Sequence, residues 1–161
     1  MKTRLFIVAL LLPSLASAEI QSAQTLQTHG RVSRLYGTPL AHGTTPVESA
    51  EAFVSEHAAD VWGVRADQLL PIGPFQDGRH VIELMHNEAT GQPKFFLIAY
   101  TPHVSGVAVY DAALKLLIRN EPTFPVVLAS AQLPAIEGFS LRQGVRPSNL
   151  DATMLRATGM H

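Results

Sequence analysis

The clearest amphipathic pattern in the chain lies between residues 46 and 62. Apolar side chains recur there at three- and four-residue spacing, the period of a helix that is buried on one side. Thr45 precedes Pro46 and stands three residues before Glu48, which is typical of a capping box with proline at the first helical position. Gly63 is a suitable residue to end the helix. The expected core stripe is Ala50, Phe53, Val54, His57, Ala58 and Val61.

After residue 79 the hydrophobic period changes to two, which is the period of a β-strand. The first strand would place His80, Ile82, Leu84 and His86 on one face and Val81, Glu83 and Met85 on the other. Residues 87–93 contain a Thr-Gly pair and predict a hairpin connection. Residues 94–101 are apolar on both faces, which favours a central position in the sheet.

Further extended segments are predicted at residues 107–110, 112–119 and 126–131, after a turn over residues 102–106. A helix followed by strands linked as hairpins indicates an α+β fold. We therefore expect one N-terminal amphipathic helix packed on an antiparallel sheet of about four to five strands, within a domain over residues 46–131.

The segments on either side of this domain carry weaker patterns. Residues 19–45 are poor in large apolar side chains and read as an extended lead-in, with one short strand around residues 31–36. Residues 64–78 read as a connection rich in proline and glycine. Residues 132–161 read as an irregular tail with a short helix near Pro147, which is compatible with the start of a truncated further domain.

The N-terminus has the pattern of a cleavable signal peptide. Lys2 and Arg4 precede eight continuous apolar residues, and small residues at Ala16 and Ala18 predict cleavage after Ala18. Eight apolar residues are too few for a membrane-spanning helix, which needs about 20. We expect residues 1–18 to be removed and the protein to be secreted or periplasmic, with no membrane span in the mature chain.

Composition narrows the classes of function. The mature chain would carry 10 basic and 13 acidic residues, a formal charge of −3, and no basic stripe, so nucleic acid is not expected as a partner. The chain has no cysteine, which excludes disulfides, thiolate metal sites and a cysteine nucleophile.

The sequence offers no motif for catalysis, and we expect the protein not to be an enzyme and to hold no metal or cofactor. H-E-x-x-H is absent, no two of the seven histidines are four residues apart, and no G-x-S-x-G or phosphate-binding glycine loop occurs. His80 and His86 share a predicted strand face, but six residues of strand separate their backbones by about 20 Å, too far for one metal ion. Ser105-Gly106 has no identifiable base, and Glu83 and Glu88 are not a distinctive acid–base pair.

Residues 46–130 resemble the FTP domain, the N-terminal propeptide module of fungalysin- and thermolysin-type metallopeptidases. The likeness lies in the helix with its SAEAFV and VWGV segments followed by DQL, in the aromatic strand before GVAVY at residues 106–110, and in the alternating ALKLLI at residues 113–118. The chain departs from the family pattern at Ile98-Ala99, where glutamines are frequent, at Ala108, where proline is expected, and at Pro102, which interrupts the strand early.

The resemblance implies a non-catalytic domain that binds a secreted metallopeptidase, and inhibits it or assists its folding. The candidate contact region is the turn made by Pro102, His103, Val104, Gly106, Val107, Val109 and Tyr110. Two alternatives remain open at this point: an exported protein-interaction module with no peptidase partner, and the truncated front end of a metallopeptidase precursor. An enzyme of an unrecognised type is the least favoured reading.

Overall fold

Helix α2 spans Pro46–Trp62, as the amphipathic pattern predicted. Thr45 caps its first turn by accepting a hydrogen bond from the backbone N–H of Glu48 at 3.1 Å. Gly63 ends the helix with a φ of 69°, a left-handed conformation that glycine adopts without steric strain. The expected capping box differs in one detail, because the Glu48 carboxylate accepts chiefly from the N–H and hydroxyl of Thr44.

The structure is a computed structural model that describes residues 22–73 and 80–134. The predicted signal peptide (residues 1–18) and the predicted short helix near Pro147 lie outside the described residues. Within them, no helix combines the length and the hydropathy needed to cross a lipid bilayer.

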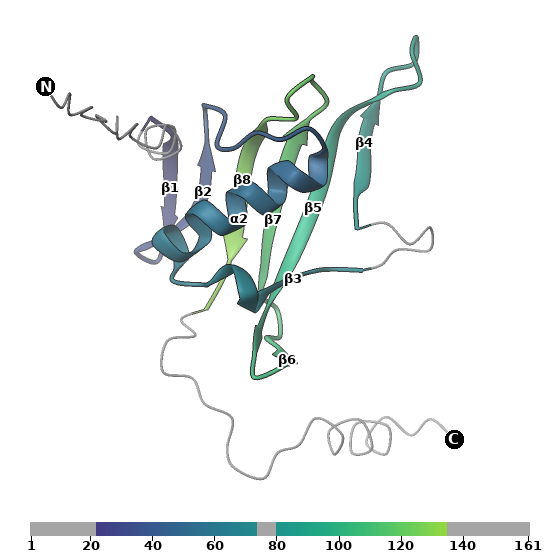
Figure 1. Cartoon of the computed structure of the whole chain (residues 1–161). Helices are drawn as coiled ribbons and strands as arrows, with labels where there is room; N and C mark the ends of the chain where they lie inside the picture. Colours follow the sequence, from purple (N-terminus) through teal and green to yellow (C-terminus); the bar gives the residue numbers. More distant parts are fainter. Residues whose placement is uncertain (1–21, 74–79, 135–161) are drawn as a thin grey trace, which may run out of the picture.

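Within residues 22–73 and 80–134, eight strands form the antiparallel sheet, where four to five were predicted. They are β1 (Gln24–Thr28), β2 (Arg31–Tyr36), β3 (Leu69–Pro71), β4 (Ile82–His86), β5 (Pro93–Val104), β6 (Val107–Ala108), β7 (Ala113–Arg119) and β8 (Val126–Gln132). The order across the sheet is β1-β2-β8-β7-β5-β3, and β4 and β6 also pair with β5 (Figure 1). The α+β class is confirmed, and the central position predicted for the second strand is that of β5.

The helix is not the first element, because a β-hairpin precedes it. The predicted strand at residues 31–36 is β2, and β1 pairs with it across the two-residue turn His29-Gly30, where both residues have positive φ. Two left-handed residues match the twist of the flanking strands in a tight hairpin. β2 in turn pairs with β8, so the first hairpin joins the sheet beside the last strand.

The short strand β3 lies within the segment that was predicted to be only a connection. A 3-10 turn over Ala66–Gln68 leads into it, and Leu69 enters the core. β3 pairs with the C-terminal half of β5, and β4 pairs with the N-terminal half of the same strand. The pairing was not visible in the sequence because three residues are too few to establish a period of two.

Strand β5 continues through Pro102 to Val104, whereas the sequence predicted a turn from residue 102. The ladder between β5 and β7 ends at Tyr100, so the missing N–H of Pro102 removes no bond to β7. The chain reverses at Ser105-Gly106, where φ values of 51° and 81° form a two-residue hairpin turn into β6.

The strand predicted at residues 80–86 is β4, and its backbone is distorted near its end. Met85 has a φ of 55°, which is unusual for a side chain of its size and interrupts the regular pleat. Glu83 and His86 were expected on opposite faces, but the His86 Nε2 lies 3.2 Å from the Glu83 Oε2. The pairing with β5 nevertheless keeps its register, with Ile82, Leu84 and His86 opposite Leu97, Phe95 and Pro93 as a period of two requires, so only the Glu83–His86 contact departs from the prediction.

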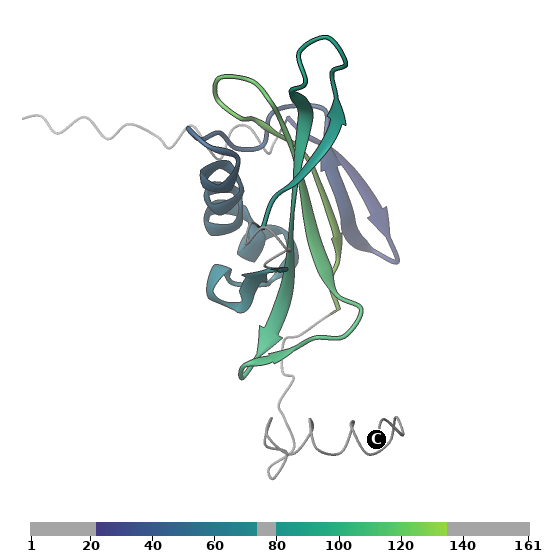
Figure 2. The ribbon, with the colours of Figure 1, turned by 90° about the vertical axis from the view of Figure 1, so that its right-hand side faces the viewer.

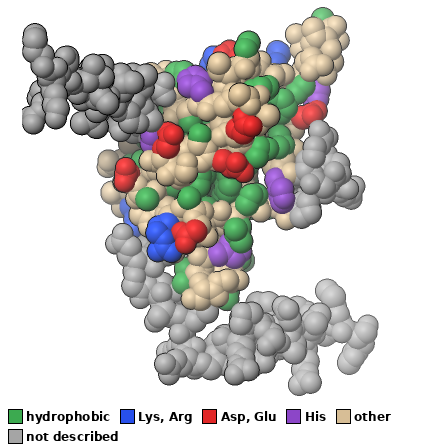
Figure 3. All heavy atoms as spheres, in the orientation of Figure 1, with side chains coloured by type: hydrophobic (Ala, Val, Ile, Leu, Met, Phe, Trp, Pro, Cys, Tyr) green, Lys and Arg blue, Asp and Glu red, His purple; other side chains and the backbone are tan. Residues whose placement is uncertain are grey.

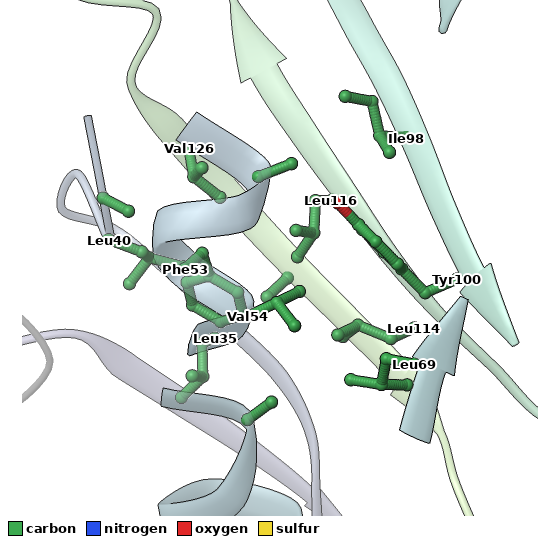
Figure 4. Close-up of a cluster of buried hydrophobic side chains, with 14 of the residues drawn as sticks. Leu35, Leu40, Phe53, Val54, Leu69, Ile98, Tyr100, Leu114, Leu116 and Val126 are labelled. Atoms are coloured by element: carbon green, nitrogen blue, oxygen red, sulfur yellow. The ribbon is translucent and has the colours of Figure 1, made fainter. Parts of the chain in front are cut away.

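The core lies between α2 and one face of the sheet (Figure 4). Phe53 is fully buried at its centre and contacts the rings of His57 and Trp62. The Trp62 indole donates to the Val32 carbonyl at 2.7 Å, which ties the end of the helix to β2. The largest fully buried side chains from other elements include Leu40, Ile98, Leu114, Leu116, Ile118 and Val126. The predicted stripe on α2 is buried apart from Val61, which is half-buried, and Ser49 is buried with it.

Candidate functional site

One face of the sheet points away from α2 and is not covered by the helix. Figure 2 shows the helix on one side of the sheet, while the β1–β2 hairpin and the loop after β6 extend toward the other side. We call this second surface the open face. Its side chains follow from the register, because Leu114, Leu116 and Ile118 of β7 are buried toward α2 and the alternate residues point away.

A polar row crosses the open face from β2 to β7. Arg34 is the cross-strand partner of Ser130, and Ser130 is also the partner of Lys115. Directly opposed residues in antiparallel strands have Cβ atoms about 4.5–5.5 Å apart, so the serine lies between the two cations. Neither Arg34 nor Lys115 makes an ion pair with a carboxylate among residues 22–73 and 80–134.

The polar row lies in a hollow of about 450 Å³. The hollow is lined by hydroxyl-bearing, cationic and small residues, which include Thr28, Ser33, Thr101, Ser130, Arg34, Lys115, Ala112 and Ala113. One wall is the loop before β7, where Asp111 has a φ of 51° and its carboxylate accepts a hydrogen bond from the Gln132 amide at 3.1 Å. The opposite wall is the β1–β2 hairpin, in which the Thr28 hydroxyl donates to the Ser33 hydroxyl.

An apolar row runs parallel to the polar row. Cross-strand pairs link Tyr36 to Leu128, Leu128 to Leu117, Leu117 to Leu97, and Leu97 to Ile82. The row therefore crosses β2, β8, β7, β5 and β4 without a polar interruption. Leu128, Leu117 and Leu97 are half-buried by their neighbours in the sheet, and Tyr36 and Ile82 are 38% and 36% exposed.

The residues of the predicted contact turn have different environments. Pro102 is buried, Gly106 is exposed, and His103, Val104, Val107 and Val109 are half-buried. Val109 lines the hollow of the polar row, and Tyr110, which is 96% exposed, lines an adjoining hollow with Arg31 and Leu133. The turn is thus at the rim of the open face, and its role in contacting a partner stays a prediction.

No group of three histidine, aspartate or glutamate side chains with metal-binding geometry occurs in the described part of the chain. Glu83 and His86 contact each other on the exposed strand β4. Ser105 serves the hairpin turn after β5, and its positive φ has a structural explanation there.

The perturbed ionisable groups lie away from the open face. Hydrogen bonds from Thr44 lower the pKa of Glu48 at the helix cap. The Arg65 guanidinium lowers the pKa of Asp67 through a hydrogen bond of 2.9 Å, and the same bond raises the pKa of Arg65. Burial raises the pKa of Tyr100 to about 12, and repulsion from Glu51 adds to the shift. These shifts mark structural contacts in the cap, the turn before β3 and the core.

The two rows of the open face were not identified from the sequence. Arg34 and Lys115 are far apart along the chain, and they become neighbours only because β2 pairs with β8 and β8 pairs with β7. The available signal was the alternation within each strand, which assigns a side chain to a face but does not give the order of the strands.

Comparison with known proteins gives no relative for this chain: no family model, no curated protein and no solved structure matches it.

Proposed function

We propose that this protein is an exported, non-catalytic domain that binds another protein through the open face of its sheet. The observation that carries the proposal is the unbroken apolar row from Tyr36 to Ile82, which α2 does not cover. A continuous apolar surface of this kind, bordered by polar and charged side chains, is typical of a protein–protein contact. The pattern of residues 1–18 supports export.

The resemblance to the FTP domain suggests a secreted metallopeptidase of the thermolysin or fungalysin type as the partner. The protein would inhibit the peptidase or assist its folding by covering part of the enzyme surface. The rim of the open face carries the predicted contact turn, and the Tyr110 side chain is almost fully exposed there. A large aromatic side chain in such a position is a suitable anchor in an interface.

Titration of a thermolysin-like enzyme with the purified exported chain tests this partner. We expect a slower rate of hydrolysis of a small reporter substrate and a dissociation constant well below millimolar. The chain could also slow the reaction by being a substrate that competes with the reporter. Electrophoresis of the same samples distinguishes the two cases, because a substrate is cleaved and an inhibitor stays intact. The Tyr110→Ala variant should bind more weakly, and Val47→Ala on the outer side of α2 is the matched control. Binding no tighter than millimolar would remove the peptidase from the proposal.

A second candidate is an exported interaction module whose partner is not a peptidase. The cationic pair beside the apolar row favours it, because Arg34 and Lys115 select for the charge of the partner and not for its enzymatic class. The two candidates are separated by the assay above together with binding measurements for variants of the open face. If the peptidase bound the variants of the open face as tightly as the wild type, the open face would not be its binding surface.

A further inference from the structure

The open face has the geometry to hold a second helix. On the covered face, α2 contacts β2, β8, β7 and β5 (Figure 1). The apolar row crosses the same four strands on the other side and continues to β4. An apolar face of a sheet is stabilised when another element packs on it, as α2 does on the covered face. We infer that the open face binds an acidic amphipathic helix of the partner protein, and this inference rests on the proposed binding function.

The dimensions define the length of the helix. The row has four gaps between neighbouring strands, which at about 4.8 Å each gives a width of about 19 Å. At about 1.5 Å per residue, a helix of about 13 residues spans that distance. Its apolar side would lie on Leu128, Leu117 and Leu97, the half-buried centre of the row.

Charge defines the flanks of the helix. Arg34 and Lys115 border the row on one side, two residues along their strands from Tyr36 and Leu117. On the other side is Arg119, whose guanidinium is already 3.0 Å from a carboxylate oxygen of Glu121. Arg34 and Lys115 make no ion pair within the described residues. The one carboxylate that lines their hollow, Asp111, accepts a hydrogen bond from the Gln132 amide, so two cations face one anion there and the side of the hollow keeps a net positive charge. A helix with glutamate or aspartate along that flank would complement them.

The shape of the surface favours a helix over a membrane. The β1–β2 hairpin and the loop after β6 extend beyond the plane of the sheet (Figure 2), and both line the hollow. A planar bilayer surface would touch these walls before it reached Leu117. The outer side of α2 is not an alternative site for an acidic helix, because acidic side chains cover it (Figure 3). They are Glu48, Glu51, Glu56 and Asp60, all of which are exposed.

The test uses two designed helical peptides of about 14 residues that share one leucine stripe. One peptide has glutamates on the flanks and the other has lysines at the same positions. Fluorescence anisotropy with the full exported chain should give about tenfold tighter binding of the glutamate peptide, as expected from two partly exposed ion pairs. The double variant Arg34→Glu/Lys115→Glu should prefer the lysine peptide instead.

Two controls separate the open face from general charge and hydrophobicity. Arg65→Glu removes an exposed cation elsewhere and should leave the preference unchanged. Leu117→Asp should abolish binding of both peptides, while Val47→Asp on α2 should not, with circular dichroism confirming that each variant is folded. An unchanged preference in the charge-reversed protein, or binding only to vesicles of anionic phospholipid, would overturn the inference.

The outcome is independent of the peptidase assay. Charge-dependent peptide binding without peptidase binding would retain the surface and reject the peptidase as partner. Peptidase binding that is unaffected by the charge reversal would retain the partner and reject the acidic helix.

Discussion

Phe53 is the residue on which the packing of α2 depends most directly. Its side chain is fully buried among residues from the helix and the sheet (Figure 4). Phe53→Ala should lower the free energy of unfolding by about 3–5 kcal/mol, because it removes apolar contacts and leaves a cavity. Urea denaturation measures the change, with Val47→Ala at an exposed position of the same helix as the control. Equal stabilities of Phe53→Ala and the wild type would contradict the position of this core.

His57 is a buried polar residue on the same helix, and its Nε2 has no hydrogen-bond partner within the described residues. The nearest carboxylate oxygen, from Glu56, is 3.6 Å away, beyond a good hydrogen bond. His57→Leu should therefore leave the melting temperature unchanged or raise it, because it removes an unsatisfied buried atom. His57→Gln retains polar atoms and should melt lower. A marked loss of stability in the leucine variant would show that the imidazole has a partner.

Tyr100 predicts how the protein behaves at high pH. Its pKa is raised from 10.0 to about 12, so the folded state retains the phenol proton more strongly than the unfolded state does. The stability linked to this group is fully present below pH 10 and is lost as the pH rises from 10 toward 12. Tyr100→Phe should lose less stability across that interval. Urea midpoints measured for both proteins between these values would show no difference if the phenol were accessible to solvent.

Among the elements, the two-residue turns determine how the hairpins close. Gly106 has a φ of 81°, and a methyl group added there would meet no atom within 4 Å. Gly106→Ala should thus cost about 1–2 kcal/mol through backbone conformation alone. Gly30 has the same open surroundings with a φ of 75°, and Gly30→Ala should show a similar loss. The melting temperatures of the two variants, measured by thermal denaturation, give the two losses of stability. A loss at only one position would mean that the turns differ in conformation.

The sequence predicted the elements that carry a long, regular pattern. The cap at Thr45, the end at Gly63 and the buried stripe on α2 were all recognisable, because each depends on residues that are close in the chain. β1 and β3 were missed because their short, exposed strands depend on pairing with β2 and β5. The error at Pro102 had a similar origin, since the effect of a proline depends on whether a neighbouring strand needs its N–H.

For the whole molecule, the arrangement of the sheet predicts where the backbone is most protected. β5, β7 and β8 have neighbours on both sides and are covered by α2, whereas β1 is exposed at the edge of the sheet. Amide hydrogen exchange should be slowest in the three central strands and fastest in β1 and in the outer strand β4. Mass spectrometry of protein exchanged for increasing times resolves these segments. Fast exchange in β7 would be incompatible with this strand order.

The open face could not be predicted from the sequence, because it depends on the order of the strands in the whole sheet. Its two rows arise from the order β2-β8-β7-β5-β4, which joins side chains from the second and the last strands of the described chain. Each residue was visible in the sequence as one alternate position of a strand, but its neighbours on the surface were not. The contact turn was proposed from a resemblance, and it lies at the rim of a surface that the resemblance did not specify.

The irregularity in the first hairpin has a consequence for solubility. β1 contains only glutamine, threonine and leucine, so its outer edge has no charge to repel the edge strand of another molecule. The register shifts after Leu26, and Ser33 on β2 has no partner opposite it. Such a bulge increases the local twist and makes a straight, continuous ladder with a second chain harder to build. Deleting Ser33 should straighten this edge and make edge-to-edge pairing of β1 with another chain easier.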